Sequence, residues 1–199
     1  MCHLYFDPSV RMLWETSIES SDVVETVDPD TLVFHQKCKR IWPAAQRDTL
    51  CLTHIRPILP SEDGPFPALV GGSDGVVCVG AAGLDWMVVN FSIDDEDVYV
   101  PLGGCVRARV QVSMTCRTIV SPAAMAEDEG SAPLDPQEAL SRLKRDQISC
   151  DIIYQSFVDI GGWAPAAATR AIAKKEYPKF VKKFSQFVIN QTKDMPIMF

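Results

Sequence analysis

The sequence lacks the features that mark several large classes of protein. None of its apolar stretches approaches the roughly 20 residues that span a bilayer, and its first residues lack the charged and then apolar pattern of a signal peptide. The seven cysteines are scattered and no two form a CxxC pair, so neither a disulfide framework nor a zinc site is indicated. We therefore expect a soluble, cytoplasmic protein with reduced thiols.

Signatures of enzymes and of metal sites are also scarce. The sequence has no phosphate-binding glycine loop and no HExxH motif. Its three histidines, His3, His35 and His54, lie apart and outside any metal-ligand spacing. We expect no enzymatic activity, no metal and no cofactor. The net charge of −7 argues against a nucleic acid partner, because nucleic acids select concentrated basic surfaces.

The composition suits one globular domain over residues 1–199, since 47% of the residues are hydrophobic. Several segments alternate apolar and polar residues with the period of two that marks half-buried strands. They are 31–41, 106–120, 148–158 and, less regularly, 48–58. A further strand is expected at 86–93, which is apolar on both faces, so we expect it at the centre of an antiparallel sheet. His35 falls on the polar, solvent-facing side of its segment.

From about Pro165 the apolar period becomes helical. The residues that share the apolar face are Ile172, Ala173, Tyr177, Phe180, Val181, Phe184, Phe187 and Val188. Pro165 suits the first turn of a helix, whereas Pro178 is expected to bend the helix or weaken one turn. Shorter helices are expected at 8–19 and 136–144, and a long loop at 60–83.

Three polar side chains interrupt the apolar faces of separate strands: Gln36, Asn90 and Tyr154. Burying an unpaired amide or hydroxyl costs about 1–3 kcal/mol. Contacts with the backbone, with one another or with trapped water would satisfy them. So would a ligand with an apolar body and a head group carrying hydroxyls and an amide. Glu15 could join them, or could instead form a helical ion pair with Arg11.

Specific motifs are spread along the chain. They are WETSIE at 14–19, KRIWPAAQRD at 39–48, VNFS at 89–92, GGWAP at 161–165 and KKEYPKF at 174–180. As a set they resemble the START domains (StAR-related lipid transfer), a family of lipid-binding domains, and among these the members that carry ceramide. The similarity covers nearly the whole chain outside its two long loops.

The resemblance implies an α+β fold of the helix-grip type. In this fold a curved antiparallel β-sheet wraps around a long C-terminal α-helix and encloses one lipid in a hydrophobic tunnel. Compared with the family, the chain begins late. We therefore expect the initial helix and the first strands to be missing before Met1, and the domain to be partial at its N-terminus.

The resemblance also implies functional residues. The head group of ceramide is expected to contact Glu15, Gln36, Asn90 and Tyr154, with Arg11 as the supporting ion-pair partner of Glu15.

Membrane docking at the tunnel entrance is expected from Trp42, Pro43 and Trp163, because an indole suits the interface between lipid and water. The alternative is that each tryptophan packs in the core.

The function implied by this resemblance is non-vesicular lipid transfer. The protein would bind one ceramide and move it from the endoplasmic reticulum to the Golgi apparatus, as a cytoplasmic protein peripheral to both membranes. The alternative is a regulatory or scaffold domain that binds diacylglycerol, phosphatidylcholine or a sterol without transferring it. The partners expected are therefore a lipid and, transiently, a membrane surface.

Overall fold

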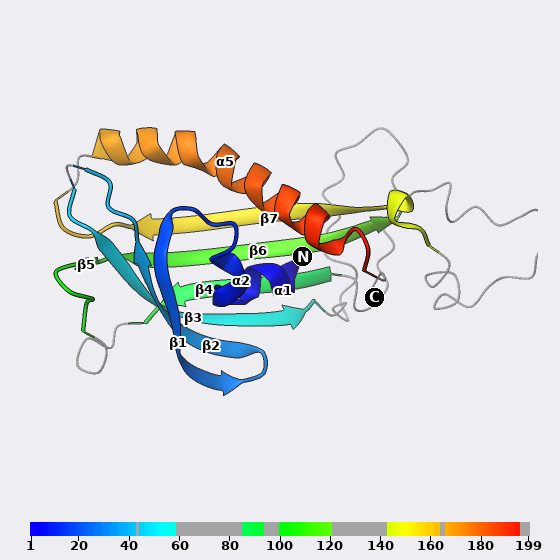
Figure 1. The fold of residues 1–199 in the computed structure, drawn as a ribbon, viewed down its shortest axis with the longest axis horizontal. Helices are drawn as coiled ribbons and strands as arrows, with labels where there is room; N and C mark the ends of the chain where they lie inside the picture. Colours follow the sequence, from blue (N-terminus) through cyan, green and yellow to red (C-terminus); the bar gives the residue numbers. More distant parts are fainter. Residues whose placement is uncertain (43, 59–84, 94–99, 121–142, 164–165, 196–199) are drawn as a thin grey trace, which may run out of the picture.

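The computed structural model describes the chain except for residues 43, 59–84, 94–99, 121–142, 164–165 and 196–199. Figure 1 shows one sheet with a long helix lying across it. The strands are β1 Ile18–Asp28, β2 Thr31–Cys38, β3 Arg47–Pro57, β4 Asp85–Ser92, β5 Val106–Arg107, β6 Arg109–Val120 and β7 Ile148–Asp159. The helices are α1 Cys2–Phe6, α2 Pro8–Arg11, the 3₁₀ turn η1 Arg145–Gln147 and α5 Ala166–Thr192.

The sheet has the strand order β1-β2-β3-β4-β6-β7, and all of these neighbours pair antiparallel. The short β5 lies off this path and pairs in parallel with β3. Strand β4 stands between β3 and β6, which confirms the central position expected for 86–93. The predicted fold, an antiparallel sheet combined with a long C-terminal helix, is likewise confirmed.

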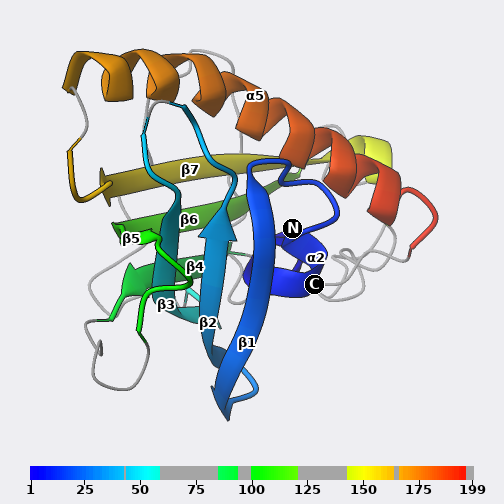
Figure 2. The ribbon, with the colours of Figure 1, turned by 60° about the vertical axis from the view of Figure 1, so that its left-hand side comes forward.

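Helix α5 packs on the core mainly through its second half. In the second half Phe184 and Val188 are buried, whereas in the first half Ile172 and Tyr177 are 38% and 39% exposed. Figures 1 and 2 show the second half of α5 approaching α1 and α2, and the first half extending away from them. The helix continues through Pro178. The first half of α5 therefore has fewer apolar contacts to hold it in place.

An aromatic cluster joins the N-terminal residues to α5. The Tyr5 ring meets the Phe184 ring edge-on, with centroids 5.8 Å apart. Trp14 packs against Phe184 at 4.8 Å and against Phe180 at 5.3 Å. Aromatic pairs at these separations contribute about 0.5–1.5 kcal/mol beyond the burial of their area. The first 14 residues therefore hold the second half of α5 against the sheet.

The N-terminal segment differs from its prediction. The helix expected over 8–19 is only the single turn α2, and β1 begins at Ile18 and pairs with β2. The Asp7 carboxylate caps α2 by accepting from the Ser9 amide at 2.8 Å. Strand β1 was not predicted, because it is an edge strand that is largely exposed and its side chains show no clear alternation of apolar and polar residues.

The strand expected over 106–120 is divided at Ala108, whose amide donates to the carbonyl oxygen of Asp48 at 2.8 Å. Residues on the two sides of Ala108 therefore pair with different strands, β3 and β4. The loop predicted at 60–83 and most of the helix predicted at 136–144 lie outside the described residues.

Candidate functional site

Asn90 lies on the central strand β4 and is 3% exposed. The orientation of its carboxamide follows from its neighbours, because only one orientation gives both of its polar atoms suitable partners. In that orientation its nitrogen donates to Thr53 Oγ1 at 2.5 Å and to the Val89 carbonyl oxygen at 3.1 Å. Its oxygen accepts from Arg11 Nη2 at 3.1 Å. Asn90 is therefore fixed in place by the protein itself.

Arg11, on α2, is 7% exposed. Its guanidinium lies over the rings of Tyr5 and Phe34, with its central carbon 4.3 and 5.4 Å from the two centroids. Its Nη2 donates to the Tyr5 carbonyl oxygen at 2.9 Å. The ion pair expected with Glu15 is not among those that the described residues form, and Glu15 Oε1 accepts from Ser17 Oγ at 2.6 Å instead.

Tyr154, on β7, lies in the same region of the interior. Its ring is 6.2 Å from the Tyr5 ring and 5.0 Å from the Phe180 ring, centroid to centroid. Burial raises the pKa of the Tyr154 phenol, and the adjacent Tyr5 hydroxyl raises it further, so the phenol is neutral. The Tyr5 hydroxyl also lies 3.5 Å from the carboxamide of Asn90. Tyr5 thus links two of the predicted head-group residues, Asn90 and Tyr154.

Gln36, on β2, lies on the same face of the sheet as Asn90. Gln36 is opposite Thr49 of β3, and Asn90 is opposite Thr53 of the same strand. Because Thr49 and Thr53 are four positions apart, their side chains point to the same side. The Gln36 carboxamide oxygen is buried and has no hydrogen-bond partner among the described residues.

The thiol of Cys38 connects Gln36 with Glu15. Burial raises the pKa of Cys38, its hydrogen bond with Gln36 lowers it in part, and the Glu15 carboxylate raises it again. Gln36 is therefore within hydrogen-bonding reach of this thiol, whereas the Glu15 carboxylate acts on it through its charge alone. The four predicted head-group residues thus form two groups, one around Cys38 and one around Tyr5.

Three buried polar atoms near these groups have no hydrogen-bond partner within the described part of the chain. They are the donors Arg11 Nε and Trp14 Nε1 and the acceptor Gln36 Oε1. Leaving such an atom unpaired costs about 1–3 kcal/mol. A molecule that offers both an acceptor and a donor could satisfy them.

Sequence reasoning missed Tyr5, Thr53 and Trp14 as parts of this region. Helix α1, which carries Tyr5, has only five residues, too few to show a helical period. Trp14 lay in the part of the predicted helix 8–19 that does not form. Thr53 lay in 48–58, the least regular of the predicted strands.

The two tryptophans predicted to dock at a membrane are exposed: Trp42 by 82% and Trp163 by 75%. Pro43 lies outside the described residues. Arg47 joins the two loops that carry them, since its Nε donates to the Ile160 carbonyl oxygen at 3.2 Å and its Nη2 to the Gly161 carbonyl oxygen at 3.3 Å. The alternative of two buried core tryptophans is wrong.

A separate buried cluster surrounds Asp48, which is 0% exposed. Its carboxylate lies 2.7 Å from His35 Nε2 and accepts from the Leu102 amide at 2.8 Å and Arg107 Nε at 3.2 Å. Burial acts to raise the pKa of Asp48, but the hydrogen bonds from Leu102, Arg107 and His35 outweigh it and lower the pKa. The expectation that His35 faces solvent is wrong, because His35 is 7% exposed within this cluster.

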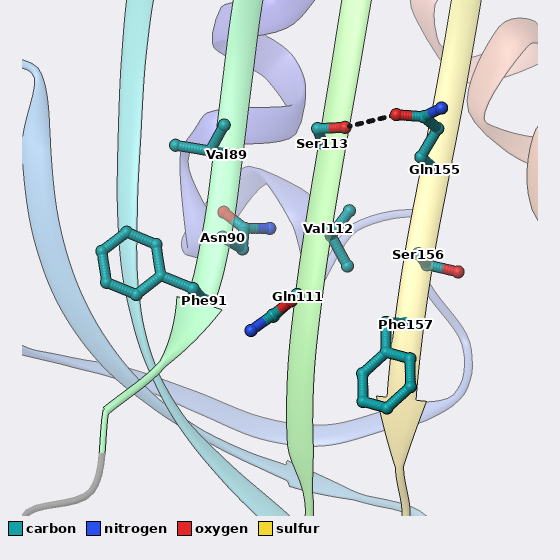
Figure 3. A pocket seen from close by; sticks show the side chains of 9 residues that line it. All are labelled: Val89, Asn90, Phe91, Gln111, Val112, Ser113, Gln155, Ser156 and Phe157. Atoms are coloured by element: carbon teal, nitrogen blue, oxygen red, sulfur yellow. Dashed lines mark hydrogen bonds between the residues drawn. The ribbon is translucent and has the colours of Figure 1, made fainter.

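A hollow of about 490 Å³ lies over β4, β6 and β7 (Figure 3). Asn90 and Val112 point toward the core side of the sheet. The neighbouring side chains that alternate with them, among them Phe91, Gln111 and Phe157, therefore point to the opposite side. Asn90 also lines this hollow, so the hollow adjoins the group around Tyr5.

Within the described residues, no helix is both long and apolar enough to cross a membrane.

Comparison with known proteins gives consistent matches. The family model of the START domain matches residues 78–194. The ceramide transfer protein of Xenopus laevis is 37% identical over 199 residues, and that of Homo sapiens is 39% identical over 200 residues. Each alignment covers 100% of this chain and 27% of the relative. The chain thus spans about a quarter of the length of these relatives.

Two solved structures share the fold. Human STARD10 superposes with a TM-score of 0.59 at 17% sequence identity, over 97% of this chain and 60% of that chain. Human StAR-related lipid transfer protein 5 superposes with a TM-score of 0.55 at 12% identity, over 90% of this chain and 64% of that chain. At such identities the agreement concerns the curved sheet and the C-terminal helix alone.

Proposed function

This chain belongs to the START domain family, and we propose that it is a lipid carrier that binds one ceramide and moves it between membranes. The lipid is taken from the relatives, which are ceramide transfer proteins. Residues 1–199 would act as one lipid-binding domain without catalytic activity.

The observation that carries the proposal is the set of unpaired buried atoms, Arg11 Nε, Trp14 Nε1 and Gln36 Oε1. Ceramide has an amide carbonyl and hydroxyl oxygens that accept hydrogen bonds, and an amide N–H and hydroxyls that donate them. It therefore supplies both kinds of partner that these atoms need. Each of its buried methylenes would add about 0.8 kcal/mol, so the chains supply affinity and the head group supplies selectivity.

We assign the head group to Glu15, Gln36, Asn90 and Tyr154. Asn90 and Tyr154 both interact with Tyr5, and Glu15 and Gln36 both act on Cys38. A head group lying between these two groups would contact both of them. Arg11 would hold Asn90 in the orientation that it has in the structure.

Docking at the membrane is assigned to Trp42, Pro43 and Trp163. The exposure of both indoles and the link between their loops through Arg47 support this assignment. The membranes involved would be those of the endoplasmic reticulum and the Golgi apparatus, with the protein peripheral to both.

Transfer of labelled ceramide between liposomes tests the proposal. Asn90→Ala should lower the transfer rate about tenfold or more, because it removes a carboxamide that orders the buried polar groups. Asn190→Ala is the matched control, since Asn190 is an exposed helical residue bonded to Gln186, and its transfer rate should equal that of the wild type. Equal rates for all three proteins, or no transfer by the wild type, would remove the proposal.

A further inference from the structure

Helix α5 carries a basic face that takes no part in the core. Six residues of the helix are basic and one is acidic, a net charge of +5 in a chain whose net charge is −7. The basic residues are all exposed: Arg170, Lys174, Lys175, Lys179, Lys182 and Lys183. Positive charge is therefore concentrated within about four turns of one helix.

The spacing of these residues sets the direction in which much of this charge points. Lys175, Lys179 and Lys182 are separated by four and three positions, so they form a stripe along one side of the helix. On the opposite side, Phe180 and Phe184 pack against the aromatic cluster around Trp14. This lysine stripe therefore faces solvent, away from the sheet.

One acidic side chain among the described residues pairs with the lysine stripe. Lys179 Nζ lies 2.9 Å from Glu176 Oε1, and the two side chains are 49% and 53% exposed. A pair this exposed contributes at most about 1 kcal/mol. Lys175 and Lys182 belong to no ion pair within the described part of the chain. Their charge is thus available to an anionic partner.

The lysine stripe adjoins the surface that carries the two exposed tryptophans. Trp163 lies three residues before the start of α5. In Figures 1 and 2 the loop between β2 and β3, which holds Trp42, lies beside the first half of the helix. That loop adds two exposed basic residues, Lys39 and Arg40. Indoles and cations thus lie at the same end of the molecule, the combination that anionic membrane surfaces attract.

We infer that the lysine stripe binds anionic lipid head groups, so that α5 lies on an anionic membrane surface when the protein docks. The inference rests on the membrane docking of the proposed function, but not on the identity of the lipid cargo. Ile172, three positions before Lys175, is 38% exposed and adds an apolar side chain to the same side of the helix. A membrane offers an apolar layer as well as anionic head groups, whereas an acidic protein or a nucleic acid would match the charge alone.

Co-sedimentation with two kinds of vesicle tests the inference: phosphatidylcholine alone, and phosphatidylcholine mixed with phosphatidylserine. The wild type should bind the anionic vesicles about tenfold or more tightly than the neutral ones. Most of this preference should disappear at about 1 M salt, where the screening length falls to about 3 Å. Lys175→Gln combined with Lys182→Gln should weaken binding to the anionic vesicles about 5- to 30-fold, the effect of two cations near such a surface.

Arg56→Gln combined with Lys193→Gln is the matched control, because it removes the same charge from exposed positions on β3 and beyond the end of α5. It should bind both vesicles within about twofold of the wild type. Equal binding of the wild type to both vesicles, or equal losses in the two variants, would overturn the inference. So would tighter binding to polyglutamate than to the anionic vesicles, which would assign the stripe to an acidic protein.

The proposed cargo is tested separately by transfer of labelled ceramide. A wild type that prefers anionic vesicles but transfers no ceramide would remove the cargo and leave this inference standing. A wild type that transfers ceramide without distinguishing the two vesicles would do the opposite.

Discussion

Arg47 and Ile160, which are 113 positions apart in the chain, meet where the two tryptophan-bearing loops come together: Arg47 Nε donates to the Ile160 carbonyl oxygen at 3.2 Å. Trp42 precedes Arg47 by five positions, and Trp163 follows Ile160 by three. One guanidinium therefore joins the two loops that carry these tryptophans, whose side chains are the most exposed aromatic ones among the described residues. We propose that a membrane surface would meet both indoles.

Removing both indoles should separate docking from lipid binding. Trp42→Ala combined with Trp163→Ala is expected to reduce co-sedimentation with liposomes about tenfold, because each indole loses its place at the interface between lipid and water. Binding of solubilised ceramide should change less than twofold. Undiminished co-sedimentation of the double variant would contradict the assignment.

Gly161→Ala should destabilise the Trp163 loop. Gly161 has a φ of +57°, and an added Cβ would lie 2.6 Å from the carbonyl oxygen of Arg107. Strain and close contact together should lower the free energy of unfolding by about 2–3 kcal/mol, measured by urea titration.

Gly104→Ala is the matched control for this substitution, because Gly104 has a φ of +78° but open space around it. It should show the cost of the backbone conformation alone, about 1 kcal/mol. Equal losses of unfolding free energy in the two variants would show that the contact with Arg107 does not destabilise the protein.

The Asp48 cluster should make the fold sensitive to acid. The pKa of Asp48 is lowered in the folded protein, so its contribution to stability is fully present above the ordinary carboxyl pKa of about 3.9 and is lost as the pH falls through the lower, folded value. Unfolding measured between pH 7 and pH 2 should show this loss.

Asp48→Asn should remove that part of the pH dependence. It should also destabilise the protein at pH 7 by about 3 kcal/mol, because the buried Arg107 loses its carboxylate partner. A wild-type protein and an Asp48→Asn variant with parallel stability curves below pH 4 would contradict this account.

The two halves of α5 should respond differently to truncation. Phe184→Ala should lower the free energy of unfolding by about 3–5 kcal/mol, because Phe184 is 2% exposed within the aromatic cluster. Ile172→Ala in the first half should cost less than 1 kcal/mol, since Ile172 is already 38% exposed. Amide exchange should show the same order, with the first half of the helix exchanging faster. Equal costs would mean that α5 is held evenly along its length.

The sequence by itself determined most of the long elements and the family. Alternation with a period of two placed four of the long strands, and the helical period from about Pro165 placed α5 to within a residue of its start. Both signals are local, because a strand or helix with one buried face must repeat its apolar residues at its own period. The polar exceptions Asn90 and Tyr154 were visible for the same reason.

Only the tertiary structure decided what surrounds those residues. Tyr5 reaches Asn90 across 85 positions of sequence, and His35 is buried because Leu102 and Arg107 join it around Asp48. A periodic pattern shows that a face is apolar or polar, but not which distant segment covers it. Packing between elements determines the partners of a buried polar group, so the local spacing of residues in the sequence does not predict them.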